Sequence, residues 1–174
     1  ANASINAIKA SKEAGIRYIR YERKGTSCNG AVWVKDFNEA ANECQKYDNI
    51  FLAIGSKNLE RFKPLWESGK RVTVRVLPSS HIVKKCEDLG LIPDRIIAMM
   101  GPFSIGLNYQ LFKQATAQAI VTKDSGIPGG VPEKVKAAEM LGIPAIVVKR
   151  PSVNYPFVIS NIDTLIDEVT IKWI

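Results

Sequence analysis

The stretch Val121-Thr122-Lys123-Asp124-Ser125-Gly126, followed by Gly129-Gly130, decides the fold that the sequence predicts. A short apolar run, residues 119–121, ends here in polar residues and glycines. A helical pattern follows from about residue 132 to 141, with a proline at its first turn and a glycine past its end. The stretch therefore predicts a strand, a loop and a helix. In open α/β sheets, ligands bind at this carboxyl edge of the strands.

The same alternation of short apolar strands and helices recurs through residues 49–150. Five strands are predicted, at residues 50–54, 71–77, 95–99, 118–121 and 145–149. Strands that alternate with helices are typical of parallel βαβ units, whose crossovers are right-handed. The sequence thus predicts an α/β fold, with one Rossmann-like open parallel sheet of about five strands and helices on both faces.

Residues 1–35 do not fit within this sheet. Alanines at helical spacing predict a helix over residues 3–14, and alternation of apolar and charged residues predicts a strand over 16–21. Residues 24–35 are interpreted as a linker. One helix and one strand cannot bury themselves, so we expect this piece to complete a sheet outside the chain, or to exchange with a second copy in a homodimer. The expected division is therefore 1–35 and 36–174.

Several predicted strand ends carry residues suited to an anion. The candidate binding residues are Gly55, Ser56, Lys57, Gly101, Pro102, Phe103, Ser104, Thr122, Lys123, Asp124, Ser125, Gly126, Gly129 and Gly130. Helix N-termini offer unpaired N–H groups and a partial positive charge, glycine permits close backbone approach, and lysines add full charges. Carboxylates or phosphates are the matching ligand groups.

These residues also have structural roles open to them. Ser56 and Ser104 suit helix N-caps. Asp124 suits a turn or a pair with the neighbouring lysine, and Phe103 suits the core. Lys123 is the strongest candidate for ligand contact, because it directly follows an apolar strand and stands among turn residues.

The charge of the chain is unevenly distributed. The formal net charge is +7, and residues 1–87 hold all of it, with 16 Lys and Arg against 9 Asp and Glu. Residues 88–174 balance, 8 against 8. Such a field attracts nucleic acid or a small polyanion. Because no run of adjacent basic residues is interleaved with aromatics, we expect the small polyanion and no nucleic acid.

Other features narrow the classes of function. No apolar run approaches the roughly 18 residues of a membrane span, so no membrane association is expected. Three widely spaced cysteines are typical of reduced thiols in a cytoplasmic protein. His81 is the only histidine, so neither a His-centred metal site nor a Ser-His-Asp triad is expected. The chain contains neither a dinucleotide fingerprint after the first strand nor a P-loop motif.

Taken together, the strand ends resemble the precorrin-6A reductase family of cobalamin biosynthesis, from about residue 4 to 151. The order and spacing of the motifs carry the resemblance. The matching segments are 51–59, 75–78, 96–104, 121–130, Glu133-Lys134, Ala137-Ala138, Leu141-Gly142-Ile143 and Arg150-Pro151, with Asn6-Ala7, Gly15-Ile16 and Arg20-x-Glu22-Arg23 earlier in the chain.

The resemblance implies an oxidoreductase that passes hydride from NADPH or NADH to a double bond of a corrin precursor, a tetrapyrrole rich in carboxylates. It implies two Rossmann-like domains with the ligands between them, and no metal; no catalytic residue is assigned. The family's Gly-Gly-Thr and Asp-Ala-Thr-His-Pro segments do not occur here. We therefore expect a carboxyl-terminal portion, inactive alone, with 1–35 as the tail of the first domain. The alternative is a non-catalytic α/β domain that binds a polyanionic small molecule.

Overall fold

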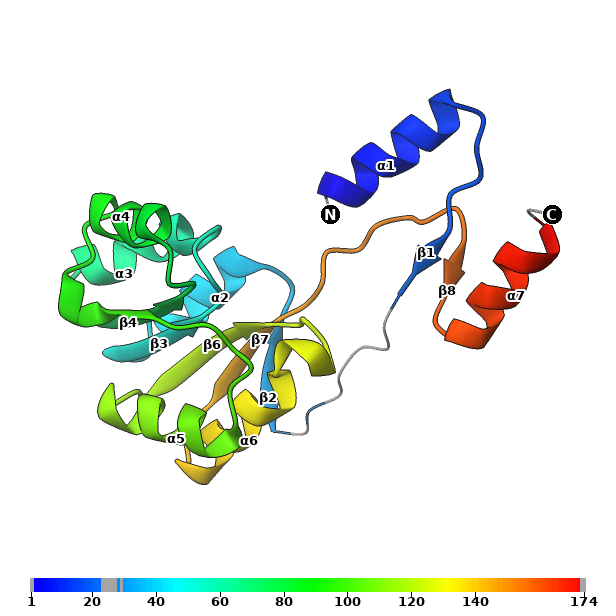
Figure 1. Cartoon of the computed structure of the whole chain (residues 1–174). Helices are drawn as coiled ribbons and strands as arrows, with labels where there is room; N and C mark the ends of the chain where they lie inside the picture. The colour runs from blue at the N-terminus through cyan, green and yellow to red at the C-terminus, as the bar shows by residue number, and fades with distance from the viewer. Residues whose placement is uncertain (1, 23–27, 29, 173–174) are drawn as a thin grey trace. The chain divides into compact units, whose positions relative to one another are not determined.

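The structure, a computed structural model, describes residues 2–22, 28 and 30–172. Contacts divide the chain into two compact units, one of residues 26–150 and one that combines residues 1–25 with 151–174 (Figure 1). This grouping differs from the expected division at residue 35, because the carboxyl-terminal segment packs with the amino-terminal one. Residues 23–27 and 29 of the expected linker, with Arg23, lie outside the described residues.

The larger unit is built on a fully parallel six-stranded sheet, which confirms the expected α/β fold. Its strands are β2 (Ala31–Val34), β3 (Asn49–Ala53), β4 (Arg71–Val76), β5 (Ile96–Ala98), β6 (Ala119–Lys123) and β7 (Ala145–Val148). The strand order is β2-β7-β6-β3-β4-β5. The sequence predicted five strands, because the short run of β2 was assigned to the linker. In the structure β2 pairs with β7 along its whole length at the edge of the sheet.

Helices cover both faces of this sheet (Figure 1). They are α2 (Phe37–Cys44), α3 (Lys63–Glu67), α4 (Ser80–Asp88), α5 (Ile105–Gln114) and α6 (Val131–Met140), with 3₁₀ turns η1 (Leu59–Phe62), η2 (Pro93–Arg95) and η3 (Ile127–Gly129). Pro64 lies in the first turn of α3, where a backbone N–H would have no acceptor within the helix, so a proline costs no hydrogen bond there.

The alternation of side chains along each strand produces two cores. In β3, Ile50 and Leu52 pack with α2, α3 and α4, whereas Phe51 faces α5 and α6. Phe51 meets Phe112 of α5 edge to face, with ring centroids 4.8 Å apart. Because the strands are buried on both faces, they read as continuous apolar runs in the sequence.

The strand order places a topological switch between β3 and β6. The chain runs outward from β3 through β4 to β5, then returns to the other side of β3 to form β6 and β7. The helices after β3 lie on one face, and α6, which follows β6, lies on the other. The loops that follow β3 and β6 therefore lead to opposite faces of the sheet from the carboxyl ends of neighbouring strands. Open α/β sheets bind ligands at such a point.

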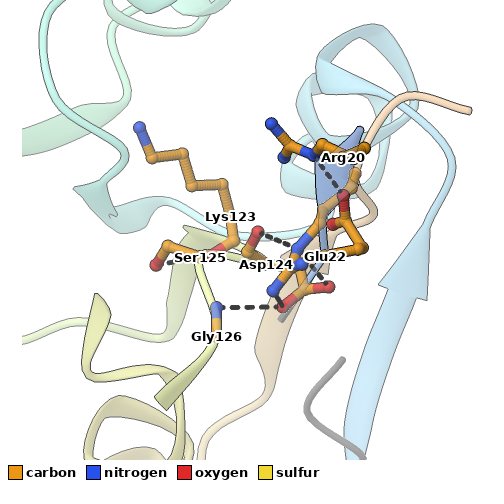
Figure 2. Close-up of polar contacts among 7 residues, drawn as sticks. Arg20, Glu22, Lys123, Asp124, Ser125 and Gly126 are labelled. Atoms are coloured by element: carbon orange, nitrogen blue, oxygen red, sulfur yellow. Dashed lines mark hydrogen bonds and ion pairs between the residues drawn. The ribbon is translucent and has the colours of Figure 1, made fainter. Parts of the chain in front are cut away.

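The smaller unit contains α1 (Asn2–Glu13), β1 (Arg20–Tyr21), β8 (Val158–Ile159) and α7 (Ile162–Lys172). The partner of β1 was expected outside the chain, but β1 pairs in parallel with β8 of the same chain. Arg20 donates to Glu22 at 2.8 Å (Figure 2). Asn161 caps α7, because its Oδ1 accepts from the N–H groups of Asp163 and Thr164.

Candidate functional site

A cavity of about 740 Å³ lies at the carboxyl edge of the six-stranded sheet. Residues from the ends of β3, β4, β5 and β6 line it, together with the start of α6. The lining residues are Ala53, Ile54, Gly55, Arg75, Val76, Leu77, Met99, Gly101, Pro102, Phe103, Lys123, Ser125, Pro128, Gly129, Gly130, Glu133 and Lys134. The cavity therefore includes the switch between β3 and β6.

The structure brings part of the predicted set together around this cavity. Those that line it are Gly55, Gly101, Pro102, Phe103, Lys123, Ser125, Gly129 and Gly130. Those that do not line it are Ser56, Lys57, Ser104, Thr122, Asp124 and Gly126.

Strand β6 continues two residues beyond the predicted end, so Thr122 and Lys123 belong to it. Thr122 is fully buried, and its Oγ1 has no hydrogen-bond partner. Lys123 is exposed at the end of the strand, and its side chain points away from Asp124 (Figure 2). The strand thus delivers one lysine to the cavity while it buries the residue before.

Asp124 shapes the loop after β6. Its Oδ1 accepts from the N–H of Gly126 at 3.2 Å (Figure 2). Its Oδ2 lies 3.2 Å from Nε of Arg150. Arg150 also donates through Nε to the backbone carbonyl of Asp124. The predicted pair of Asp124 with Lys123 is therefore replaced by one with Arg150, which ties the ends of β6 and β7 together.

Two glycines are required by close approach in this loop. A Cβ on Gly129 would overlap the side chain of Ser125. Gly126 has a φ of +72°, and a Cβ there would lie 2.9 Å from Nη2 of Arg150. The loop can therefore pack against Ser125 and Arg150 only because these two positions carry no side chain.

Ser104 has the structural role that the sequence left open to it. Its hydroxyl accepts from the N–H of Leu107 at 3.2 Å and so caps α5. Phe103, the residue before it, lines the cavity and lies over a guanidinium group, so it is not simply a core residue.

Sequence reasoning did not select Arg75 as a site residue. This side chain lies on β4, is 5% exposed and lines the cavity. Its Nη1 donates to Oδ1 of the fully buried Asn108 at 2.9 Å, and its guanidinium carbon lies 3.8 Å from the ring centroid of Phe103. Burial lowers the pKa of Arg75 to about 10.

Lys134 was also missed as a site residue. It is 7% exposed, lies at the fourth position of α6 and donates through Nζ to the carbonyl of Gly129 at 2.5 Å. Burial, with the neighbouring charge of Arg75 second, lowers the pKa of Lys134 to about 8. Glu133 raises this pKa, and Lys123 lowers it further. Oε2 of Glu133 is buried and has no hydrogen-bond partner.

The sequence contained a signal for both cations. Arg75 interrupts the apolar β4, in Val72-Thr73-Val74-Arg75-Val76, and a charge within a buried strand needs a reason. Lys134 stands near a helix N-terminus, where a cation is unfavourable. The sequence alone does not show that Arg75 and Lys134 line the same cavity, because that depends on the order of the strands.

The arrangement is suited to an anion held against an apolar wall. Three cations border the cavity, and no described carboxylate lies within 4.0 Å of the charged nitrogens of Arg75 or Lys134. Among the described residues, no group of three or more His, Cys, Asp or Glu could hold a metal ion. No helix in the described part of the chain is long and apolar enough to cross a membrane. All three cysteines are free thiols.

Comparison with known proteins agrees with this geometry. The chain is 41% identical to the cobalt-precorrin-6A reductases of Methanothermobacter thermautotrophicus and Methanocaldococcus jannaschii, over 97% and 95% of its length. It spans 58% and 66% of those two proteins. The solved structure of a CobK precorrin-6A reductase superposes with a TM-score of 0.77 at 26% identity, covering 98% of this chain and 68% of that one.

A family model described as precorrin-6x reductase CbiJ/CobK matches residues 1–170, nearly the whole chain. The resemblance drawn from the strand ends is thereby confirmed. The chain belongs to the precorrin-6x reductase CbiJ/CobK family.

Proposed function

We propose that this chain forms part of an oxidoreductase of cobalamin biosynthesis that reduces a double bond of precorrin-6A or its cobalt form. Its ligands are a carboxylate-rich tetrapyrrole and a nicotinamide cofactor, NADPH or NADH. The observation that carries the proposal is the cavity at the switch between β3 and β6, bordered by Arg75, Lys123 and Lys134, in a chain of this family.

The cavity suits both kinds of ligand. Its apolar wall includes Leu77, Met99 and Phe103, which match a macrocycle or a nicotinamide ring. Its cations match acetate and propionate side chains, or the phosphates of the cofactor. Gly129 and Gly130 let the backbone approach a phosphate at the start of α6.

The protein's part in such a reaction is to bind and orient. The bound cofactor supplies the hydride. The residues of the cavity hold the acceptor double bond and exclude water from it. Lys123, at the end of β6, supplies an exposed positive charge for an anionic group of the ligand. The free thiols favour a reducing compartment, and we place the enzyme in the cytoplasm.

The second candidate function is binding without catalysis. The cavity with its buried cations lies wholly within residues 26–150, which favours an anion-binding unit even when no reaction follows. Purified residues 1–174 distinguish the two. We expect them to bind NADPH or a tetrapyrrole without turnover of precorrin-6A. Oxidation of NADPH that depends on added precorrin-6A would show that this chain is active alone.

The site itself is tested by Lys123→Met. Loss of a charged hydrogen bond to a carboxylate or phosphate weakens binding by roughly 1.5–3 kcal/mol, measured by titration calorimetry with NADPH and with a polycarboxylate tetrapyrrole. Lys57→Met is the matched control, since Lys57 does not line the cavity. Equal effects of the two substitutions on both ligands would remove Lys123 from the proposed site.

A further inference from the structure

We propose that Arg75 and Lys134 together form a seat for one oxyanion of the ligand, a carboxylate or a phosphate, inside the cavity of the larger unit. The proposal rests on the proposed function for its choice of ligands. It adds two binding residues, both buried, that the strand-end motifs did not select.

The first argument is that both charges are buried without a carboxylate partner. Arg75 is 5% exposed and Lys134 7% exposed, and no described Asp or Glu forms an ion pair with either. Buried charges in proteins are normally paired, because removing an ion from water is costly. Each has one hydrogen-bond acceptor among the described residues, Asn108 for Arg75 and the Gly129 carbonyl for Lys134.

The second argument is that the two cations act on each other. The charge of Arg75 lowers the pKa of Lys134, so the two groups are near enough to repel. They come from different elements, β4 and α6, which the fold brings to one cavity. An oxyanion bound between them would offset burial and repulsion together.

The third argument comes from the start of α6. Gly130 precedes this helix in the left-handed conformation, with a φ of +65°, and no side chain caps the helix. Uncapped N–H groups and the helix dipole favour an anion at this end and disfavour a lysine. The helix dipole thus disfavours the charge of Lys134, and a bound anion would offset that effect.

The fourth argument is that Arg75 is held in place before a ligand arrives. Phe103 lies against its guanidinium, and Asn108 accepts from Nη1. Asn108 is itself fixed, because its Nδ2 donates to the carbonyls of Phe103 and Ser104. A guanidinium offers five N–H donors, so several remain for a bidentate oxyanion.

Glu133 defines the ligand further. Its buried Oε2 has no partner, and it lines the same cavity. An oxyanion bound at the two cations would leave this oxygen free to accept from an N–H or O–H of the same ligand. A tetrapyrrole and a nicotinamide cofactor both carry such donors beside their anionic groups.

Titration calorimetry on residues 1–174 tests the seat with three probes: inorganic phosphate, NADP⁺, and uroporphyrin III as a tetrapyrrole octacarboxylate. We expect Arg75→Met and Lys134→Met each to weaken at least one probe roughly 10- to 100-fold, the effect of one charged hydrogen bond. The matched controls are exposed cations of the same two elements, Arg71→Met and Lys136→Met. If Arg75→Met fails to fold, Arg75→Lys replaces it as the test variant. We expect Arg75→Lys to weaken binding less than Arg75→Met, because it keeps the charge and loses only the bidentate contact.

The arms separate the possible ligands. Loss with uroporphyrin alone assigns the seat to a carboxylate, and loss with NADP⁺ or phosphate alone assigns it to a phosphate. If uroporphyrin never binds but phosphate binding is lost in both variants, the seat stands and the proposed function fails. If the wild-type chain binds uroporphyrin and both variants bind every probe as tightly as the controls, the seat is overturned while the proposed function survives. Binding of none of the probes by the wild-type chain at millimolar concentrations also overturns the seat.

Discussion

Two helices of the same unit, α2 and α6, begin in opposite ways. Asp36 caps α2, and its Oδ1 accepts from the N–H groups of Asn38 and Glu39 at 2.9 Å each. These hydrogen bonds, led by the one from Glu39, hold the pKa of Asp36 below its usual value. Helix α6 has no side chain that caps it. Its first turn contains one acidic residue, Glu133, which the buried Lys134 follows directly.

The contrast shows which helix start is complete by itself. α2 satisfies its own N–H groups and places anions where the dipole favours them. α6 leaves its amino end uncapped and adds a cation at an unfavourable position. A helix start that is destabilised within its own chain, at the edge of a sheet that binds ligands, is best explained by a group that arrives from outside.

The sharpest way to test this contrast is to remove the unfavourable charge. Moving the pKa of Lys134 from 10.5 to about 8 costs the folded state about 3 kcal/mol at neutral pH. Lys134→Met removes that cost and loses one hydrogen bond to Gly129, worth about 1 kcal/mol. We therefore expect the unliganded variant to be about 2 kcal/mol more stable than the wild type in urea unfolding. A less stable variant would mean that Lys134 is a structural residue.

The control is the pH dependence of the stability difference between the wild type and Lys134→Met. Because the pKa of Lys134 is lower in the folded state, the cost is complete below pH 8 and disappears as pH rises toward 10.5. The charged groups that act on it are Arg75, Lys123 and Glu133. The free energy of unfolding of the wild type should therefore rise by about 1 kcal/mol relative to that of Lys134→Met between about pH 7 and 9. A constant difference across that range would contradict the assigned pKa.

The contrast can also be broken by giving α6 an anion of its own. A Cβ on Gly130 would lie 3.7 Å from Nζ of Lys134, so Gly130→Asp places a carboxylate beside the lysine. That carboxylate competes with a bound oxyanion, and we expect phosphate or NADP⁺ to bind roughly tenfold more weakly by calorimetry.

Gly142→Asp is the control for Gly130→Asp. Gly142 follows the same helix with a similar φ of +67° and has open space around it, so the backbone strain is matched. Equal loss of binding in both variants would assign the effect to strain rather than to the new carboxylate.

The sequence predicted the parallel sheet because each central strand is an apolar run between turn residues, and burial on both faces produces that pattern. It failed at β2, a short apolar run of four residues at the edge of the sheet, which was assigned to the linker. It also failed to place β8, a two-residue strand whose partner β1 lies more than a hundred residues earlier. Such pairings depend on the tertiary fold, which local periodicity does not contain.

For the candidate site, the sequence predicted the residues that follow strands, since the carboxyl edge of a parallel sheet is fixed by strand direction alone. It therefore reached Gly55, Phe103 and Lys123. It missed Arg75, which lies inside a strand, and Lys134, which lies inside a helix. Their common cavity arises from the packing of β4 and α6, and the sequence does not show that these two elements meet.

A smaller effect is expected at a third helix start, that of α5. Ser104 caps this helix as Asp36 caps α2, so Ser104→Ala should lower the free energy of unfolding by about 1 kcal/mol in urea. Ser104→Asp keeps an acceptor at the cap and should retain the stability. Binding of phosphate and NADP⁺ should stay near the wild-type value in both variants, since Ser104 does not line the cavity. Unchanged stability together with weaker binding would move Ser104 from the capped class of helix starts to the class of α6, in which the start of the helix serves the ligand.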